Sequence, residues 1–265
     1  MIINKHPFIR QCLLWSESLA VLLTVLLLWW LASHGDWISR VFLPTPEATW
    51  ASLIQGFSAD PGTDAADLGQ ATCQTFMRMF VGWGVASVMG IALGTLIGMS
   101  PMARDWIAPT LEFLRPLPAS AVLPLAISLF GLSANMVLFV VSFGAMWPVL
   151  LATVQGLAQV EPRLKEVAAG LQLSRVAFAW KIGLPSTLPD ILAGMRLSLT
   201  VSLIVAVVGE MIASQPGLGQ AILLSARSFR ASELFAGIVL LGTLGFLSNA
   251  FLATLESRLL RWQHP

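Results

Sequence analysis

The feature of this sequence that most restricts its fold is the length of its uncharged segments. No Asp, Glu, Lys or Arg occurs between Arg115 and Glu161, nor between Arg78 and Arg104. About 20 apolar residues in a helix cross the hydrocarbon core of a bilayer, which is about 30 Å thick. The chain carries 11% charged residues, whereas a soluble domain carries about 25%. The sequence therefore predicts a protein whose main solvent is lipid.

We expect residues 1–265 to form a single domain, an all-α polytopic transmembrane helical bundle of about six spans. Gly131–Asn135 is predicted to separate the third span from the fourth, and Pro118 and Pro124 interrupt the start of the third. For the first span a cleavable signal peptide is the alternative, but no clear cleavage site follows it, so a retained helix is favoured. The expected spans are Leu13–Ser33, Met79–Ala103, two within residues 116–160, and residues 191–212 and 234–255.

The distribution of Lys and Arg predicts how these spans are oriented, because loops rich in these residues remain in the cytoplasm. Both termini are then cytoplasmic, residues 33–71 form an outer loop, and residues 161–190 form a cytoplasmic segment. The inner segments hold Lys5, Arg10, Arg104, Arg115, Arg163, Lys165, Arg175, Lys181, Arg258 and Arg261, and the outer ones hold Arg40, Arg227 and Arg230.

The sequence lacks the patterns that would indicate an enzyme or a nucleic-acid-binding protein. It contains no phosphate-binding loop, no serine-hydrolase elbow and no His-Glu-x-x-His motif. Its three histidines lie near chain ends or in loops, so no metal site is expected, and the net charge of +1 gives no basic excess. Cys12 and Cys73 are expected to pack as small apolar residues.

Two charged residues lie within the span expected at 191–212. Arg196 is near one end and Glu210 is near the other. Charged side chains at membrane depth commonly serve function, so both are candidates for lining a pathway. The alternative is that they pair with other charges or extend to the interface.

Small residues follow one another at intervals of four in the second span, at Gly82, Ala86, Gly90, Gly94 and Gly98. Such a stripe permits close approach of another helix. It fits packing within the subunit or a moving interface, and the pattern does not separate these two interpretations.

Residues 161–190 have the periodicity of short amphipathic helices and do not read as a flexible loop. Pro162 suits a first helical turn, and Ser174 is placed to cap a second helix. Apolar and basic positions recur at intervals of three and four from Val167 to Phe178. The segment either presents a docking surface to a partner or rests on lipid headgroups.

The same segment resembles the signature of ABC-importer permeases. Glu166 and Ala168 match its E-x-A, Leu171 follows, and Leu184-Pro185 ends it. Further matches are similar to the aliphatic sulfonate, taurine and nitrate branch of these permeases. They are Phe42-Leu-Pro-Thr-Pro46, Leu114-Arg-Pro-Leu-Pro118, Leu129-Phe-Gly131, Gly194-Met-Arg-Leu197, Val208-Gly-Glu-Met211 and Gly217-Leu-Gly219.

The resemblance implies a type I ABC importer permease-like fold in a bacterial cytoplasmic (inner) membrane. The chain would translocate a small polar or anionic organic solute, and it would hold no cofactor. ATP and Mg would be bound by separate ATP-binding cassette subunits, so the chain itself would not be an enzyme. A second permease subunit, identical or not, and an extracytoplasmic solute-binding protein complete the implied assembly. The residues implied in coupling to the ATPase are Glu166, Ala168, Gly170, Leu171, Arg175, Leu184 and Pro185.

The chain departs from the signature at two positions. Val167 replaces the second alanine, and Gln172 replaces the glycine of the turn. Glycine adopts a positive φ at little cost and glutamine does not, so we expect the bend to shift to Gly170 or the docking surface to differ. An ion-coupled secondary transporter or a stand-alone membrane enzyme is the alternative function; it would require coupled acids at mid-membrane.

Overall fold

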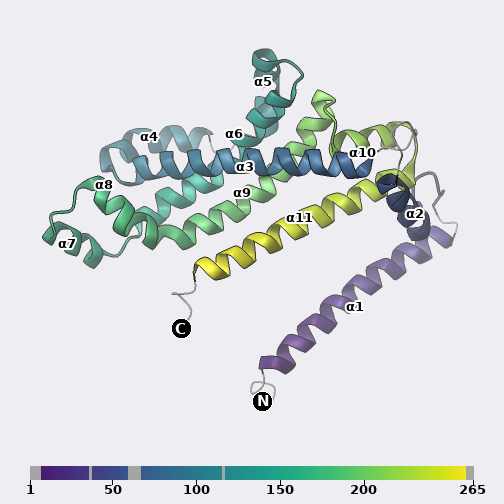
Figure 1. Cartoon of the computed structure of the whole chain (residues 1–265), viewed down its shortest axis with the longest axis horizontal. Helices are drawn as coiled ribbons and strands as arrows, with labels where there is room; N and C mark the ends of the chain where they lie inside the picture. Colours follow the sequence, from purple (N-terminus) through teal and green to yellow (C-terminus); the bar gives the residue numbers. More distant parts are fainter. Residues whose placement is uncertain (1–6, 36–37, 59–66, 115–116, 261–265) are drawn as a thin grey trace. The chain divides into compact units, whose positions relative to one another are not determined.

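The computed structural model describes residues 7–35, 38–58, 67–114 and 117–260, which form helices and turns without a strand (Figure 1). Lys5, Arg115 and Arg261, and the side chains of Arg10 and Arg104, lie outside what the structure describes. The helices are α1 (Pro7–His34), α2 (Pro46–Phe57), α3 (Leu68–Gly98), α4 (Pro101–Leu114), the 3-10 helix η2 (Ala119–Val122), α5 (Leu123–Phe130), α6 (Ala134–Ala158), α7 (Pro162–Gly170), α8 (Arg175–Phe178), the π-helix η3 (Ala179–Gly183), α9 (Leu184–Ala213), α10 (Leu218–Arg227) and α11 (Ala231–Leu259).

The long helices coincide with most of the expected spans. Within the described residues, four continuous helical segments are long and apolar enough to cross a membrane: Leu68–Gly98, Ala134–Ala158, Arg175–Ala213 and Ala231–Leu259. Helix α1 has 28 residues, or about 42 Å at 1.5 Å per residue, and its exposed leucines and valines from Leu19 onward suit contact with lipid. The all-α transmembrane fold is confirmed.

The third expected span is shorter than a membrane crossing. Its apolar helical part runs from Ala119 to Phe130, about 18 Å long, against a hydrocarbon core of about 30 Å. Gly131 ends it with φ +64°, a conformation that costs glycine little. Ser133 then starts α6, because its side-chain oxygen accepts a hydrogen bond from the Met136 amide at 3.3 Å. The position of the break was predicted correctly. The helix before it is shorter than the predicted membrane span.

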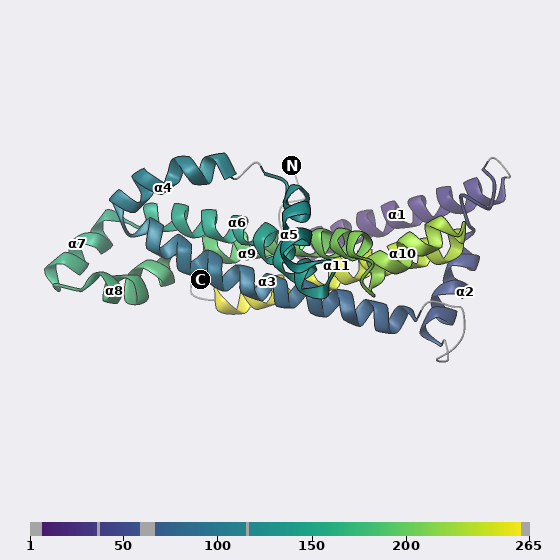
Figure 2. The ribbon, with the colours of Figure 1, turned by 90° about the horizontal axis from the view of Figure 1, so that it is seen from above.

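The chain divides into two compact units, which are described separately. The first contains residues 1–68 and 222–239, and the second contains residues 69–221 and 240–265. In the second unit α6 and α9 lie side by side (Figures 1 and 2). Ser198 on α9 donates a hydrogen bond to the backbone oxygen of Ala145 on α6 at 2.6 Å. One buried apolar cluster of this unit comprises Leu123, Ala126, Met136, Val137, Val140, Val141, Ala206 and Ala213, and a second comprises Met79, Leu199 and Leu252.

The glycine stripe of α3 packs against α6 within the same chain. A Cβ added at Gly90 would lie 3.0 Å from the amide nitrogen of Leu150, and one at Gly94 would lie 2.9 Å from its carbonyl oxygen. The two backbones are therefore too close for larger side chains at these positions. The structure favours packing within the subunit over a moving interface for this stripe.

The first unit joins the end of α1 to α2 and to the start of α11. The indole of Trp29 stacks on Phe235, with ring centroids 5.7 Å apart. Gly56 of α2 packs on the side chain of Leu68. In this unit α2 runs across the end of α1 and does not continue along it (Figures 1 and 2).

Candidate functional site

The segment between α6 and α9 folds as two short helices and a π-helical turn. Pro162 occupies the first turn of α7, and the Ser174 side chain accepts a hydrogen bond from the Ala177 amide at 3.2 Å to cap α8. Both features were predicted. The π-helix η3 then joins α8 directly to α9, so that Arg175–Ala213 is one continuous helix of 39 residues. A displacement of α8 would therefore act directly on α9.

The bend between α7 and α8 lies at Gln172, which has φ +51°. The amide of Leu173 donates to the Ala168 carbonyl, and the amide of Gln172 donates to the Ala169 carbonyl, each at 3.0 Å. These two bonds form the Schellman motif, in which glycine is the usual residue at the left-handed position. Gly170 remains inside α7. The expected shift of the bend to Gly170 is therefore wrong, because the terminal carbonyls still require the left-handed residue two positions later.

The two sides of this segment differ in what they offer to a partner. Ala168 is buried and faces its own chain, and Leu184 is half-buried. The remaining residues that the sequence assigned to coupling, Glu166, Gly170, Leu171, Arg175 and Pro185, are exposed. Large apolar side chains accompany them on the surface: Val167 is 53% exposed, Leu171 66%, Val176 68% and Trp180 71%. Sequence reasoning identified Leu171 but missed Val176 and Trp180, which lie at exposed positions of α8 and η3.

A cavity of about 420 Å³ lies between this segment and the ends of α3 and α6. Ala168, Leu173 and Phe178 contribute to its wall, together with the charged side chains of Lys165 and Arg175. The segment is thus not packed tightly along its whole inner side. It has room to shift relative to α3 and α6.

A second polar cluster surrounds Glu210 near the end of α9. The carboxylate is fully buried and accepts hydrogen bonds from the Thr75 hydroxyl at 2.9 Å and from the Gly219 amide at 3.0 Å. Arg78 donates to it at 2.8 Å and forms an ion pair. The Thr75 hydroxyl oxygen also accepts a hydrogen bond from the Leu218 amide at 2.9 Å.

This cluster explains why glycine follows α9 at position 217. A Cβ at Gly217 would collide with the carboxyl group of Glu210. The Glu210 side chain is enclosed by its own chain in this structure and does not open to solvent. Its proposed place on a transport pathway stays a prediction, and its observed contacts join α9 to α3 and to the turn before α10.

Arg196 also has a partner that the sequence did not indicate. Its guanidinium forms an ion pair with Glu256 of α11. The neighbouring carbonyl of Met195 accepts a hydrogen bond from the indole of Trp83 at 2.9 Å. The structure shows this pairing, and the place of Arg196 on a transport pathway stays a prediction. Among the described residues, no group of His, Cys, Asp and Glu is placed to hold a metal ion.

The chain matches the family described as "Binding-protein-dependent transport system inner membrane component" over residues 86–261. It belongs to this family. The matched range contains the segment at residues 161–190 and the Glu210 cluster apart from Thr75 and Arg78. The exposed short helices therefore lie within the part that defines the family.

Several permeases of this family are similar over most of the chain. The taurine transport system permease protein TauC of Escherichia coli (strain K12) is 33% identical, covering 97% of this chain and 92% of that protein. The nitrate import permease protein NrtB of Synechocystis sp. is 32% identical over 91% of this chain and 86% of its own length. The putative aliphatic sulfonates transport permease protein SsuC of Bacillus subtilis (strain 168) is 29% identical, with coverages of 94% and 88%.

A solved structure supports the same fold. The crystal structure of an amino acid ABC transporter with histidines matches with a TM-score of 0.57 and 17% identity, covering 73% of this chain and 92% of that chain. At this identity the likeness shows the fold alone. The family match and the similar permeases make this chain a permease subunit of an ABC importer, a transport component and not an enzyme.

Proposed function

We propose that this permease imports a small polar or anionic organic solute and receives the force for transport through residues 161–190. ATP-binding cassette subunits bind ATP and Mg and dock on this segment. A second permease subunit completes the pathway, and an extracytoplasmic solute-binding protein delivers the solute. The permease chain itself needs no cofactor.

The observation that carries the proposal is the set of exposed apolar side chains Val167, Leu171, Val176 and Trp180. Burying a side chain of this size is worth about 1.5–3 kcal/mol. Charged residues of both signs, including Glu166 and Arg175, surround this set. A mixture of large apolar groups and opposite charges suits a protein partner, where charges of each sign find complements.

The connection to α9 supports a mechanical role. Because η3 joins α8 to α9 without a break, movement of the docked segment is transmitted along a continuous helix. A π-helical turn often marks a functional site within a helix. The cavity beside Lys165 and Arg175 leaves space for that movement.

The substrate class and the orientation rest on other observations. The similar permeases are named for taurine, nitrate and aliphatic sulfonates, which are all small and carry an anionic group. The distribution of Lys and Arg supports a cytoplasmic position for residues 161–190 and for both termini. The family description supports the bacterial inner membrane as the location.

The docking surface is tested with Leu171→Glu and Glu166→Lys in the full transporter. Both variants should insert in the membrane normally but lose co-purification with the ATPase subunit, or lose ATP hydrolysis that responds to solute. Leu132→Glu is the matched control, because Leu132 is 59% exposed but lies between α5 and α6. Wild-type values for both segment variants would remove this surface from the proposed contact.

The importer itself is tested by uptake into proteoliposomes. We expect uptake of taurine, a sulfonate or nitrate only when the ATPase subunits and ATP are present. Uptake by the permease alone would instead support a secondary transporter.

A further inference from the structure

Helix α2 presents an apolar face that the described part of the chain does not cover. Trp50 is 63% exposed, Ile54 50% and Phe57 53%. At about 100° per residue these three side chains lie within about 60° of one another on the helix. Thr49 and Gly56 lie on another face of the helix and are buried within the first unit. The helix thus has one face packed on protein and an adjacent open face that is apolar from Trp50 to Phe57, with the exposed Glu47 on the same side at its N-terminal end.

The end of α1 fixes where this helix lies relative to the membrane. Exposed leucines and valines run along α1 as far as Leu31, and Trp29 and Trp30 lie at the end of this apolar stretch. Tryptophan is enriched at the boundary between hydrocarbon and water, where the ring is in apolar surroundings and the indole N–H finds a hydrogen-bond acceptor. The tryptophan pair therefore marks the level of the interface.

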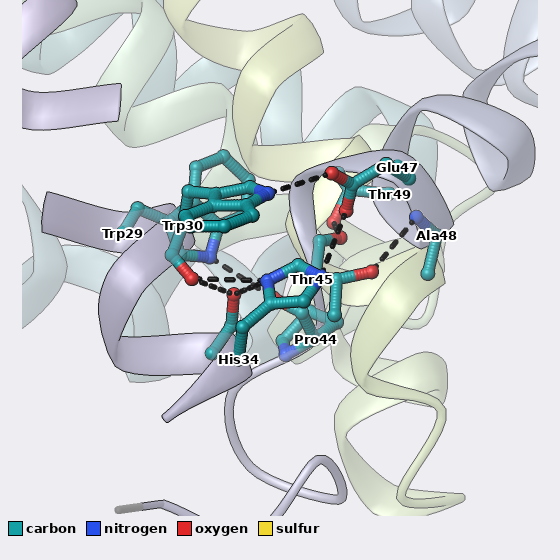
Figure 3. A network of polar contacts seen from close by, with 9 residues as sticks. Trp29, Trp30, His34, Pro44, Thr45, Glu47, Ala48 and Thr49 are labelled. Carbon is teal, nitrogen blue, oxygen red and sulfur yellow. Dashed lines mark hydrogen bonds and ion pairs between the residues drawn. The ribbon is translucent and has the colours of Figure 1, made fainter. Parts of the chain in front are cut away.

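Both indole N–H groups of this pair donate to the segment that starts α2 (Figure 3). Trp29 donates to the Pro44 carbonyl at 3.0 Å, and Trp30 donates to the Glu47 carboxylate at 3.1 Å. His34 stacks on Trp30 with ring centroids 4.5 Å apart, and its Nε2 lies 4.0 Å from Glu47. The first turn of α2 is consequently held at the level of the interfacial tryptophans.

The direction of α2 keeps the rest of the helix at that level. It runs across the end of α1 (Figures 1 and 2). Because the sequence predicts that α1 crosses the bilayer, we infer that the axis of α2 follows the membrane surface. The connection before it carries further exposed apolar side chains, Ile38, Val41 and Phe42. A helix in this position presents on one face the Trp and Phe side chains that an interfacial helix buries at the headgroup boundary, although it carries no Lys or Arg.

We propose that α2 is an interfacial anchor whose Trp50–Ile54–Phe57 face is inserted among the headgroups and upper acyl chains of the adjacent phospholipid leaflet. The exposed apolar surface of α1 ends at the tryptophan pair that holds the start of α2, which favours lipid over a protein as the occupant of this face. The anchor holds the α1–α2 connection against the bilayer. This role is independent of the solute and of the coupling segment.

The test uses the full chain in phosphatidylcholine nanodiscs, with both cysteines replaced by serine. A nitroxide is attached at Ile54→Cys and, in a second variant, at Gln55→Cys, which is also exposed but points about 140° from Trp50. Collision rates are measured with oxygen, which concentrates in lipid, and with a water-soluble nickel chelate. We expect the oxygen-to-nickel ratio to be several-fold higher at position 54 than at position 55.

A label at Leu27→Cys reports whether the protein is correctly inserted, because Leu27 lies on the exposed apolar surface of α1. With a lipid-type ratio at Leu27, equal nickel access at positions 54 and 55 would overturn the proposal. The face would then be free for a soluble protein partner. A label at Phe57→Cys gives a second reading of the same face and should follow Ile54→Cys.

Discussion

Arg78 and Glu210, separated by 132 positions in the chain, form an ion pair of 2.8 Å between α3 and α9. The Glu210 side chain is fully buried, and that of Arg78 is 15% exposed. Together with Thr75 and the amides of Leu218 and Gly219, the pair holds the turn after α9 in place. This turn is part of the sequence pattern that resembles the sulfonate-type permeases, and in the structure it contacts the Glu210 carboxylate.

Removing one partner of this pair should destabilise the protein strongly. Arg78→Met leaves the Glu210 charge buried without its counter-ion, a change that costs about 3–5 kcal/mol. Arg196→Met should cost less, about 0–1 kcal/mol, because the Arg196–Glu256 pair is more exposed. Unfolding in mixed micelles measures both. Equal losses of stability in the two variants would show that burial of the Arg78–Glu210 pair does not increase its contribution. Partial recovery of stability in Arg78→Met/Glu210→Gln would instead show that the unpaired buried charge causes the loss.

Gly217→Ala should disrupt the same cluster by a different route. The new methyl group would collide with the Glu210 carboxyl, so the carboxylate or the turn must move and the hydrogen bond from Gly219 is lost. Gly242→Ala is the matched control, since the described residues leave open space beside Gly242 in α11. Helix propensity predicts a gain of about 0.5–1 kcal/mol for the control. Similar stability of both variants would contradict the tight packing at position 217.

The conformation of Gln172 predicts a stabilising substitution in the coupling segment. Gln172→Gly should remove the steric cost of the left-handed conformation, about 1 kcal/mol. Gly170→Ala should also be tolerated, because Gly170 is helical and a Cβ there meets none of the described atoms within 4 Å. Hydrogen exchange of the 161–175 backbone measures the local effect. Loss of protection in Gly170→Ala would place the bend at Gly170 instead.

The contact between α1 and α2 should depend weakly on pH. The pKa of the Glu47 carboxyl group is lowered, mainly by a hydrogen bond from the Glu47 backbone amide at the first turn of α2. Desolvation acts in the opposite direction, and Thr45, His34 and Trp30 each lower the pKa by a smaller amount. A lowered folded-state pKa stabilises the fold above the ordinary glutamate pKa of about 4.3, and this stabilisation is lost as the pH falls through the folded value.

The advantage of wild type over Glu47→Gln in thermal unfolding should therefore be present at neutral pH and vanish in acid. Because His34 lies 4.0 Å from the Glu47 carboxylate, the comparison is repeated in a His34→Asn background. An advantage that persists at low pH would exclude the Glu47 charge as its cause. The effect is expected to be small because Glu47 is exposed to solvent.

Several properties of this protein follow from its sequence by local physics. The uncharged apolar segments specify membrane helices, since such segments are stable in lipid. Gly131, Ser133, Pro162 and Ser174 mark helix ends because their effects act within a few residues. The glycine stripe of α3 likewise predicted a close helix contact, although it did not identify α6 as the partner.

Only the tertiary structure decided which distant groups meet. Glu210 finds Arg78, Arg196 finds Glu256, and the indoles of Trp29 and Trp30 find the start of α2. The structure also placed the bend at Gln172, where the terminal carbonyls of α7 require a left-handed residue despite its cost. Such outcomes depend on contacts between elements that are far apart in the chain. The hydrophobic pattern of one segment does not indicate which charged residue of another segment will lie beside it.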